Sequence, residues 1–285
     1  VPDSAGEGIP SYLYSLNHAK GQFSFKTTVM KLASGYSTLV SFGNGGVVGP
    51  LGRVSAGLLS GTANLFIGHG LSEEDRRTAS ICGLSASIAA IFHTPVGAGV
   101  FAVEIIQRAR MGYKDLFPSI LSSIVAVWFS RLLGWKAFYT FDIPAMDIGV
   151  SIILPVIALS LIIGVIGGVY SWLYSKVVRI FRRDQGRIFL KVVLGTGIAA
   201  FSAWFLNPYL MGTSSEIFNG ILSNDLESIR GSLPSTVPIV IVLLLMFLAK
   251  MLFNCITVGS GMSAGFTGPS VLVGMLVAYA AAIIL

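Results

Sequence analysis

Four long apolar runs dominate the sequence and limit the folds that it can adopt. They cover residues 148–174, 188–206, 237–253 and 266–285. Each is near or above the roughly 17–20 residues that cross a hydrocarbon core as a helix. Only 11% of the residues are charged, well below the roughly 25% of a typical soluble domain. The sequence therefore predicts an all-α, polytopic membrane protein that sits in a lipid bilayer.

The positive net charge is explained better by membrane orientation than by nucleic-acid binding. The chain carries a net charge of +6, and its basic residues gather at 107–114 and 176–191. Two apolar segments separate these loops, so both lie on one side of the membrane, which the positive-inside rule makes cytoplasmic. The histidines and the two cysteines, Cys82 and Cys255, show no metal-ligand spacing. We therefore expect neither a nucleic-acid partner nor a metal.

Three glycine-bounded motifs, at residues 6–10, 46–50 and 265–269, each precede an apolar stretch that can form a helix. The start of a helix has unpaired N–H groups and a partial positive charge, so it can bind an anion without a full cation. Broken backbone inside a bilayer is tolerated where it lines a cavity or is buried in protein. The motifs therefore predict an anion site with these candidate residues: Glu7, Gly8, Ile9, Pro10, Val48, Gly49, Pro50, Phe266 and Thr267.

The chain is expected to contain shorter helices and an internal repeat. The predicted short helices cover residues 6–20, 25–42, 50–67, 78–91, 95–107 and 116–133. Residues 246–274 loosely repeat residues 30–57, because each has an apolar helix, a glycine break that ends in Gly-Pro, and a helix of small residues. Such duplication, often inverted, is typical of transporters and channels. No soluble domain or linker is evident, so residues 1–285 are expected to form a single transmembrane domain.

These motifs resemble those of the CLC family of chloride channels and proton–chloride exchangers. Residues 6–10 match the family's Gly-Ser-Gly-Ile-Pro, residues 46–50 its Gly-Lys/Arg-Glu-Gly-Pro, and residues 265–269 its Gly-x-Phe-x-Pro. Residues 92–104 are similar to the helix that enters the family's dimer interface. The resemblance implies a CLC-like bundle of tilted and broken helices with an inverted repeat, and chloride or a similar anion as the ligand, without a cofactor. It also implies a homodimer formed through the helices around 95–133, and a partial core that lacks the family's first and last helices.

The departures from the family pattern favour a channel over an exchanger. Val48 stands where the family has its gating glutamate, and Ile105 stands where exchangers have a second, inner glutamate. Neither side chain can carry a proton, so coupled exchange has no evident carrier. The sequence therefore predicts a chloride channel with passive, proton-uncoupled anion flux.

Glu7 replaces the family's pore serine and leaves two interpretations open. A carboxylate at a helix N-terminus is electrostatically favourable, yet it would compete with the anion for the same N–H groups. Glu7 is therefore either a displaced gate or a side chain that turns aside to a solvated vestibule. A displaced glutamate would also allow the alternative function of a proton/chloride exchanger. In the third motif, Phe266 precedes Thr267, which takes the family's usual phenylalanine position.

Two basic residues and one enzyme hypothesis complete the candidates. Lys31 and Arg53 are expected to raise the positive potential near the site. The alternatives are that Lys31 is ion-paired or extends its charged end towards the membrane surface, and that Arg53 pairs with Glu7 or a carbonyl.

Ser85 and Ser263 lie in short segments that faintly resemble the serine loop of intramembrane proteases, with His93 as a possible base. That hypothesis leaves all three glycine motifs unexplained, so we expect the protein not to be an enzyme.

Overall fold

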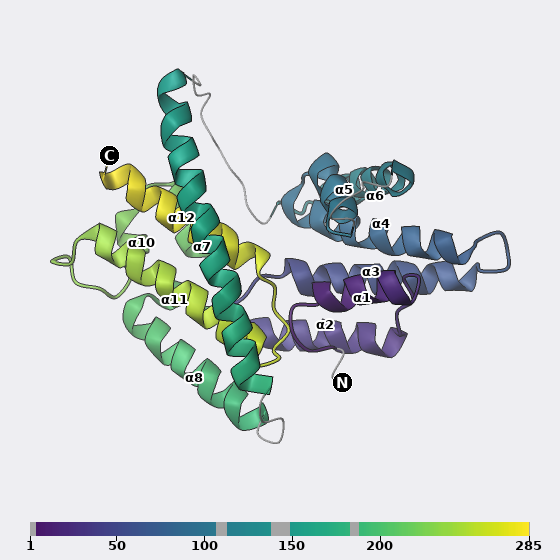
Figure 1. Ribbon diagram of the computed structural model, residues 1–285, viewed down its shortest axis with the longest axis horizontal. Coiled ribbons are helices and arrows are strands. Elements are labelled where there is room, and N and C mark those ends of the chain that lie inside the picture. Colours follow the sequence, from purple (N-terminus) through teal and green to yellow (C-terminus); the bar gives the residue numbers. More distant parts are fainter. Residues whose placement is uncertain (1–3, 107–112, 138–148, 183–187, 285) are drawn as a thin grey trace. The chain divides into compact units, whose positions relative to one another are not determined.

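The computed structural model describes residues 4–106, 113–137, 149–182 and 188–284, and within them it contains helices and no β-strand (Figure 1). The all-α prediction is therefore confirmed. The chain forms two compact units, which are described separately. The first comprises Val1–Thr38, Val47–Thr140 and Ser263–Gly265, and the second comprises Leu39–Gly46, Phe141–Met262 and Phe266–Leu285.

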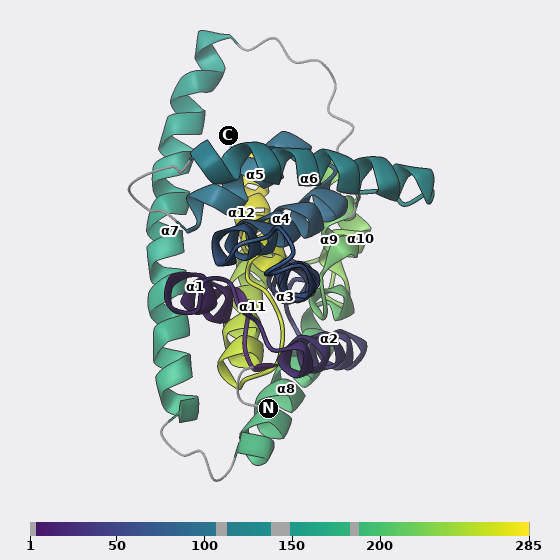
Figure 2. The ribbon, with the colours of Figure 1, turned by 90° about the vertical axis from the view of Figure 1, so that its right-hand side faces the viewer.

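The first unit is a bundle of helices that pack closely through small residues. Its helices are α1 (Ile9–His18), α2 (Phe25–Val40), α3 (Val48–Leu65), α4 (Glu73–Phe92), α5 (Pro95–Glu104) and α6 (Tyr113–Leu132). Helix α3 runs beside α4 in Figures 1 and 2, and α4 and α5 both contact α6. A Cβ at Gly83 would lie only 2.5 Å from the carbonyl oxygen of Ser55. Glycine is therefore needed for α3 and α4 to approach this closely.

The second unit is built around the long apolar helices. It contains α7 (Val150–Arg182), α8 (Ile188–Leu206), the 3₁₀ turn η3 (Pro208–Leu210), α9 (Ser215–Leu222), α10 (Leu226–Arg230), α11 (Ile239–Gly259) and α12 (Thr267–Ile284). Helix α11 contacts α7, α8 and α12. Its buried residues Met251 and Cys255 share a core with Tyr170 and Val177 of α7 and Val273 of α12.

Five helices of the described residues are long and apolar enough to cross a membrane. They are α6, α7, α8, α11 and α12, and α5 is a shorter apolar helix. The four apolar runs of the sequence thus all form helices, as predicted. Most of the surface of α7 and α8 is apolar and exposed within this chain, which is the pattern of helices that face lipid or a partner.

The basic segment 176–191 was predicted as a loop, and that prediction is wrong for most of its length. Helix α7 continues to Arg182 and α8 begins at Ile188. The helix continues because Val177 and Phe181 extend the apolar stripe of α7 into the core of the unit. Lys176 lies over the Trp172 ring, 4.1 Å from its centroid, so a basic residue is accommodated on the helix surface. Residues 107–112 of the other basic segment lie outside the described part of the chain.

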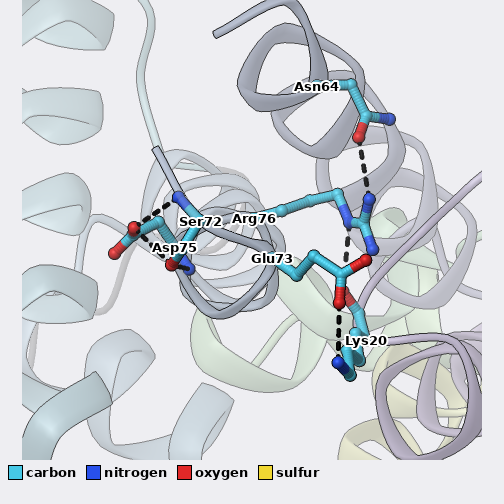
Figure 3. Close-up of polar contacts among 6 residues, drawn as sticks. All are labelled: Lys20, Asn64, Ser72, Glu73, Asp75 and Arg76. Carbon is cyan, nitrogen blue, oxygen red and sulfur yellow. Dashed lines mark hydrogen bonds and ion pairs between the residues drawn. The ribbon is translucent and has the colours of Figure 1, made fainter. Parts of the chain in front are cut away.

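Helix α4 begins at Glu73, directly after Ser72, which with the acidic residues that follow it was predicted to start a helix; a capping box forms there. The Ser72 hydroxyl accepts a hydrogen bond from the Asp75 N–H at 3.3 Å, and Asp75 Oδ2 accepts from the Ser72 N–H at 2.8 Å (Figure 3). This reciprocal pairing satisfies two N–H groups at the helix start. Glu73, Glu74 and Asp75 also favour this end of the helix dipole.

The start of α4 is tied to the turn between α1 and α2 by charged side chains. Lys20 Nζ lies 2.6 Å from Glu73 Oε2. Arg76 donates to the Lys20 carbonyl oxygen at 3.2 Å and to Asn64 Oδ1 at 3.0 Å (Figure 3). The hydrogen bond and charge of Lys20 hold the pKa of Glu73 below its ordinary value. The hydrogen bonds from Ser72 do the same for the pKa of Asp75.

Candidate functional site

The first glycine motif gives α1 an N-terminus without a side-chain cap. Gly6 and Gly8 have φ values of 73° and 105°, which favour glycine. Gly8 is the N-cap residue, and no side chain caps the helix there. Pro10 lies in the first turn, where the missing N–H costs least. The Ile9 N–H at this end therefore remains suited to an anion.

Lys31 holds the loop that leads into α1. Its side chain is fully buried, and Nζ donates to the carbonyl oxygens of Ser4, at 3.1 Å, and Gly6, at 2.5 Å. These carbonyls face the lysine, and the ammonium charge lies beside the loop rather than in solvent. Lys31 also interacts electrostatically with Glu7 and Arg53. Lys31 thus positions the loop before α1, in addition to the electrostatic role that the sequence predicted for it.

The first two glycine motifs meet in the first unit. A Cβ at Gly49 would lie 2.8 Å from both the Cγ and the carbonyl oxygen of Glu7. A Cβ at Gly8 would lie 3.0 Å from the Gly49 carbonyl oxygen, from Arg53 Cβ and from Lys31 Cε. Any larger residue would have to displace backbone at these contacts. The glycines therefore bring the starts of α1 and α3 into direct contact.

Arg53 lies one turn into α3 and is buried, with 5% of its surface exposed. Its guanidinium carbon is 4.0 Å from the centre of the Phe23 ring. Phe23 in turn stacks on Tyr12 of α1, with 6.1 Å between the ring centres and an interplanar angle of 4°. This cation–π contact holds a second positive charge next to the two helix starts.

Val48 is the first residue of α3 and packs into the core of the first unit. Only 4% of its surface is exposed, and it shares a hydrophobic cluster with Tyr12 and Phe23. Val47, before it, provides no side-chain cap, so the α3 N-terminus is uncapped like that of α1. Pro50 also lies in the first turn and is buried. Ile105, at the position of the exchangers' inner glutamate, directly follows α5 as its C-cap residue and is partly buried.

The third motif begins at Gly265 in the first unit, and its residues from Phe266 onward belong to the second unit. Phe266 packs edge-on against two tyrosines of α7, with its ring centre 5.6 Å from that of Tyr170 and 4.6 Å from that of Tyr174. Thr267 is the first residue of α12 and is partly buried. The aromatic side chain is therefore used in packing.

Lys250 on α11 repeats the arrangement of Lys31 in the second unit. It is fully buried, and Nζ donates to the carbonyl oxygens of Leu210, at 3.1 Å, and Gly212, at 3.0 Å, and to Ser214 Oγ at 2.6 Å. Lys31 likewise contacts two carbonyls that are two residues apart. Both loops lead into a short helix, α1 or α9. The equivalence of Lys31 and Lys250 was not predicted from the sequence.

Comparison with known proteins identifies the family. A family model described as voltage gated chloride channel matches residues 1–285. The chain belongs to this family. Since it also has five helices long and apolar enough to cross a membrane, this CLC family member is an integral, multi-pass membrane protein.

The relatives of this CLC chain include plant and bacterial proteins. It is 26% identical over 230 residues to the chloride channel protein CLC-a of Arabidopsis thaliana, a match that covers 71% of the chain and 30% of that protein. It is 24% identical over 257 residues to the voltage-gated ClC-type chloride channel ClcB of Citrobacter koseri, which covers 90% of the chain and 57% of that protein. The chain thus spans about a third of the plant relative's length.

Two solved structures share the fold. One is a CLC-type fluoride/proton antiporter, with a TM-score of 0.77 and 18% identity over 94% of this chain and 63% of the other. The second is a slow cyanobacterial Cl⁻/H⁺ antiporter, with a TM-score of 0.81 and 19% identity over 100% of this chain and 64% of the other. The predicted CLC-like helical bundle is therefore confirmed.

The internal repeat of this CLC chain extends to matching hydrogen bonds. In the first unit, Thr38 Oγ1 accepts from the Ser263 N–H at 3.1 Å. In the second unit, Thr257 Oγ1 accepts from the Asn44 N–H at 3.2 Å. Thr38 follows Lys31 by the same number of residues as Thr257 follows Lys250. Each bond therefore joins a helix of one repeat to the loop of the other.

The serine and histidine of the protease hypothesis do not form a catalytic pair. The Ser85 hydroxyl donates to the carbonyl oxygens of Cys82, at 2.9 Å, and Ser119, at 3.0 Å. His93 adopts a left-handed conformation at the C-terminus of α4, and its Nε2 has no hydrogen-bond partner among the described residues. Ser85 thus serves helix packing in this CLC chain.

Proposed function

We propose that the protein conducts chloride or a similar small anion passively across a membrane, without proton coupling. One observation carries the proposal. The uncapped start of α1 lies against the uncapped start of α3 through Gly8 and Gly49, beside the buried cations Lys31 and Arg53. Helix N-termini and nearby cations both favour a negative ion, and low-dielectric surroundings strengthen both effects.

The anion ligands in this proposal are backbone N–H groups from the glycine motifs. Ile9 and Gly49 supply them in the first unit. Thr267 at the start of α12 is kept as a candidate ligand of the second unit by itself. The proposal keeps Glu7 and Val48 as the candidates for gating. Residues 1–285 act as one transmembrane domain in this account.

Passive conduction is proposed because the two positions that carry glutamates in exchangers carry Val48 and Ile105 here. Val48 is also packed into the hydrophobic cluster of the first unit, where it has no group that binds a proton. Proton-coupled exchange is the second candidate. It is favoured by the proximity of the Glu7 side chain, at Cγ, to the α3 start and by the two solved structures described as antiporters.

We further propose a homodimer through α5 and α6, with the basic segments 107–114 and 176–191 on the cytoplasmic side. Helix α6 exposes large apolar side chains within the single chain, among them Phe117, Leu121 and Trp128. A membrane helix with such a face contacts either lipid or a second copy, and the family resemblance favours the second copy.

The test of anion transport uses the full-length protein reconstituted in liposomes. Chloride efflux is measured with a chloride electrode while valinomycin and potassium carry the counter-current. We expect efflux from wild type, and faster efflux at neutral pH from Glu7→Gln if the carboxylate competes with the anion, because the neutral amide no longer repels chloride. Glu7→Ser is the second variant and should behave in the same way.

The outcome for Glu7 distinguishes its two interpretations. A displaced gate gives wild-type efflux that rises as pH falls and a Glu7→Gln variant that loses most of this response. Equal efflux and equal pH dependence in the two proteins would show that Glu7 turns away from the anion path. Absence of chloride efflux from all of these proteins, with intact folding, would contradict the proposed function itself.

A further inference from the structure

A small cavity in the second unit lies beside the segment that precedes the second glycine motif. Its volume is about 20 Å³, and its walls include Asn44, Thr196, Ala199, Met211 and Thr257. A cavity of roughly 10–15 Å³ or more can hold one water molecule if polar groups line it. Asn44, Thr196 and Thr257 provide such groups, so this cavity is both large enough and polar enough.

Asn44 uses three of its four polar groups to bind the protein around it. Its N–H donates to Thr257 Oγ1, its Nδ2 donates to the Leu210 carbonyl oxygen at 3.0 Å, and its carbonyl oxygen accepts from Asn254 Nδ2 at 3.0 Å. The bond to Leu210 fixes the orientation of the amide, because a carbonyl oxygen requires a donor.

The fourth polar group of Asn44 has no partner. Asn44 is 97% buried, and its Oδ1 forms no hydrogen bond with any described residue. A buried acceptor without a donor is costly, and native structures usually supply a protein group or an ordered water. Since Asn44 is one of the residues that line the cavity, the cavity is the place where a donor can reach it.

We propose that this cavity is a binding site for one water molecule, which donates a hydrogen bond to Asn44 Oδ1. The hydroxyls of Thr196 and Thr257 complete the two to four polar contacts that a buried water makes. A cation fits the acceptor less well, because Lys250 donates to the same Leu210 carbonyl oxygen as Asn44 Nδ2 and places a positive charge nearby. The ligand is therefore a neutral donor.

The second repeat has a matching feature, which supports a role for the unpartnered oxygen. Ser263 follows Lys250 by the same number of residues as Asn44 follows Lys31. Its side chain is fully buried, and its Oγ also has no hydrogen-bond partner among the described residues. Both residues donate their N–H to a threonine of the other repeat and stand two positions before a glycine motif.

The first test fills the cavity with two side chains of equal shape. Ala199 lines the cavity, so Ala199→Val and Ala199→Thr place the same volume there, but only threonine brings a hydroxyl. If the site holds water, threonine can replace its hydrogen bond, whereas valine leaves Asn44 Oδ1 without a donor. We expect the full-length Ala199→Thr protein to unfold at a temperature roughly 2–4 °C above that of Ala199→Val.

The control measures how much a threonine hydroxyl changes the unfolding temperature when it lies on the exposed face of α8. Val193 is 48% exposed and is not among the cavity residues. Val193→Thr should unfold at or slightly below the wild-type temperature. A higher unfolding temperature for Ala199→Val than for Ala199→Thr would overturn the proposal, since filling a dry, apolar cavity stabilises a protein. Equal stability of the two variants would also overturn it.

The second test observes the ligand directly in the full-length protein in nanodiscs at high resolution. The expected result is a single density peak about 2.5–3.0 Å from Asn44 Oδ1, unchanged when sodium in the buffer is replaced by N-methyl-D-glucamine, and absent in Ala199→Val. An empty cavity would contradict the proposal. So would a peak that disappears with sodium, since this would identify a cation.

Discussion

Gly49 at the start of α3 lies directly against Glu7 of the first motif, so that a Cβ at position 49 would be 2.8 Å from both the Glu7 carbonyl oxygen and Cγ. Two motifs that are more than forty residues apart in the sequence are therefore in such close contact that no side chain fits between them at position 49. Because two helix N-termini meet here, the contact determines which N–H groups an anion would encounter.

Replacement of Gly49 by alanine should disrupt this contact. The new methyl group would overlap backbone of the first motif, so we expect Gly49→Ala to lower the free energy of unfolding by about 1–3 kcal/mol and to reduce chloride efflux. Gly61 is the control on the same helix, since a Cβ there would meet no atom within 4 Å. Gly61→Ala should be neutral or stabilising by up to about 1 kcal/mol, and a larger loss for Gly61→Ala than for Gly49→Ala would refute this account.

The two buried lysines should differ in their importance for stability. The Gly6 carbonyl oxygen accepts from Lys31 alone among the hydrogen bonds of the described residues, whereas the Gly212 carbonyl oxygen also accepts from the Gly45 N–H. We therefore expect Lys31→Met to lower the free energy of unfolding by about 1–3 kcal/mol and Lys250→Met to cost less.

Denaturant unfolding of the full-length variants measures this difference. Lys26 is exposed on α2, and Lys26→Met provides the control for the loss of a positive charge. A greater loss of stability in Lys250→Met than in Lys31→Met would contradict the assigned roles. In flux measurements, both buried variants should be slower than Lys26→Met, because each removes a buried cation, whereas Lys26 is exposed.

The capping box at the start of α4 should make stability depend on pH. Ser72→Ala is expected to cost about 1 kcal/mol at neutral pH. The Ser72 hydroxyl also donates to Asp75 Oδ2 at 2.6 Å, and this bond helps to hold the pKa of Asp75 below its ordinary value. Its contribution to stability is present above the ordinary carboxyl pKa of about 4 and is lost as pH falls through the lowered value, whereas the cap bond from the Asp75 N–H does not depend on pH. Unfolding temperatures of wild type and Ser72→Ala should therefore move closer together at acid pH. A gap that is unchanged at acid pH would refute the prediction.

The sequence was sufficient to predict the helices of the long apolar runs. Apolar runs of membrane-spanning length leave few alternatives to a helix, and all four runs are helical. The sequence assigned the first two glycine motifs to one anion site, but it did not predict the direct contact that Gly8 and Gly49 make between the starts of α1 and α3. The sequence did not reveal that α7 reaches Arg182, because charged residues obscured the continuing apolar stripe.

The contacts of Lys250, Thr38 and Thr257 were not predicted, because they depend on which distant segments of the chain come into contact. A signal was present in the spacing, since Lys31 precedes Gly49 by the same number of residues as Lys250 precedes Gly268. An alignment of the two halves on these lysines would have matched Thr38 with Thr257. It could not have shown that each threonine binds the loop of the other repeat, because a repeat in sequence does not determine which copies are in contact.

Introduction of a carboxylate at position 48 should make conduction depend on pH. Val48 is the first residue of α3, so the carboxylate of Val48→Glu would compete with an anion for the N–H groups of the helix start. We expect slower chloride efflux at neutral pH and recovery as pH falls and the group is protonated. Val48→Gln is the matched control and should show no such recovery. If Val48→Glu and Val48→Gln behave alike, position 48 does not face the anion path.

The reversal potential of the full-length protein under opposed chloride and proton gradients separates passive conduction from proton-coupled exchange. Since Val48 and Ile105 stand where exchangers have glutamates, we expect a potential that follows the chloride gradient alone and does not move when only the proton gradient is changed. A potential that shifts with the proton gradient in a fixed ratio to chloride would contradict passive conduction and would establish proton-coupled exchange.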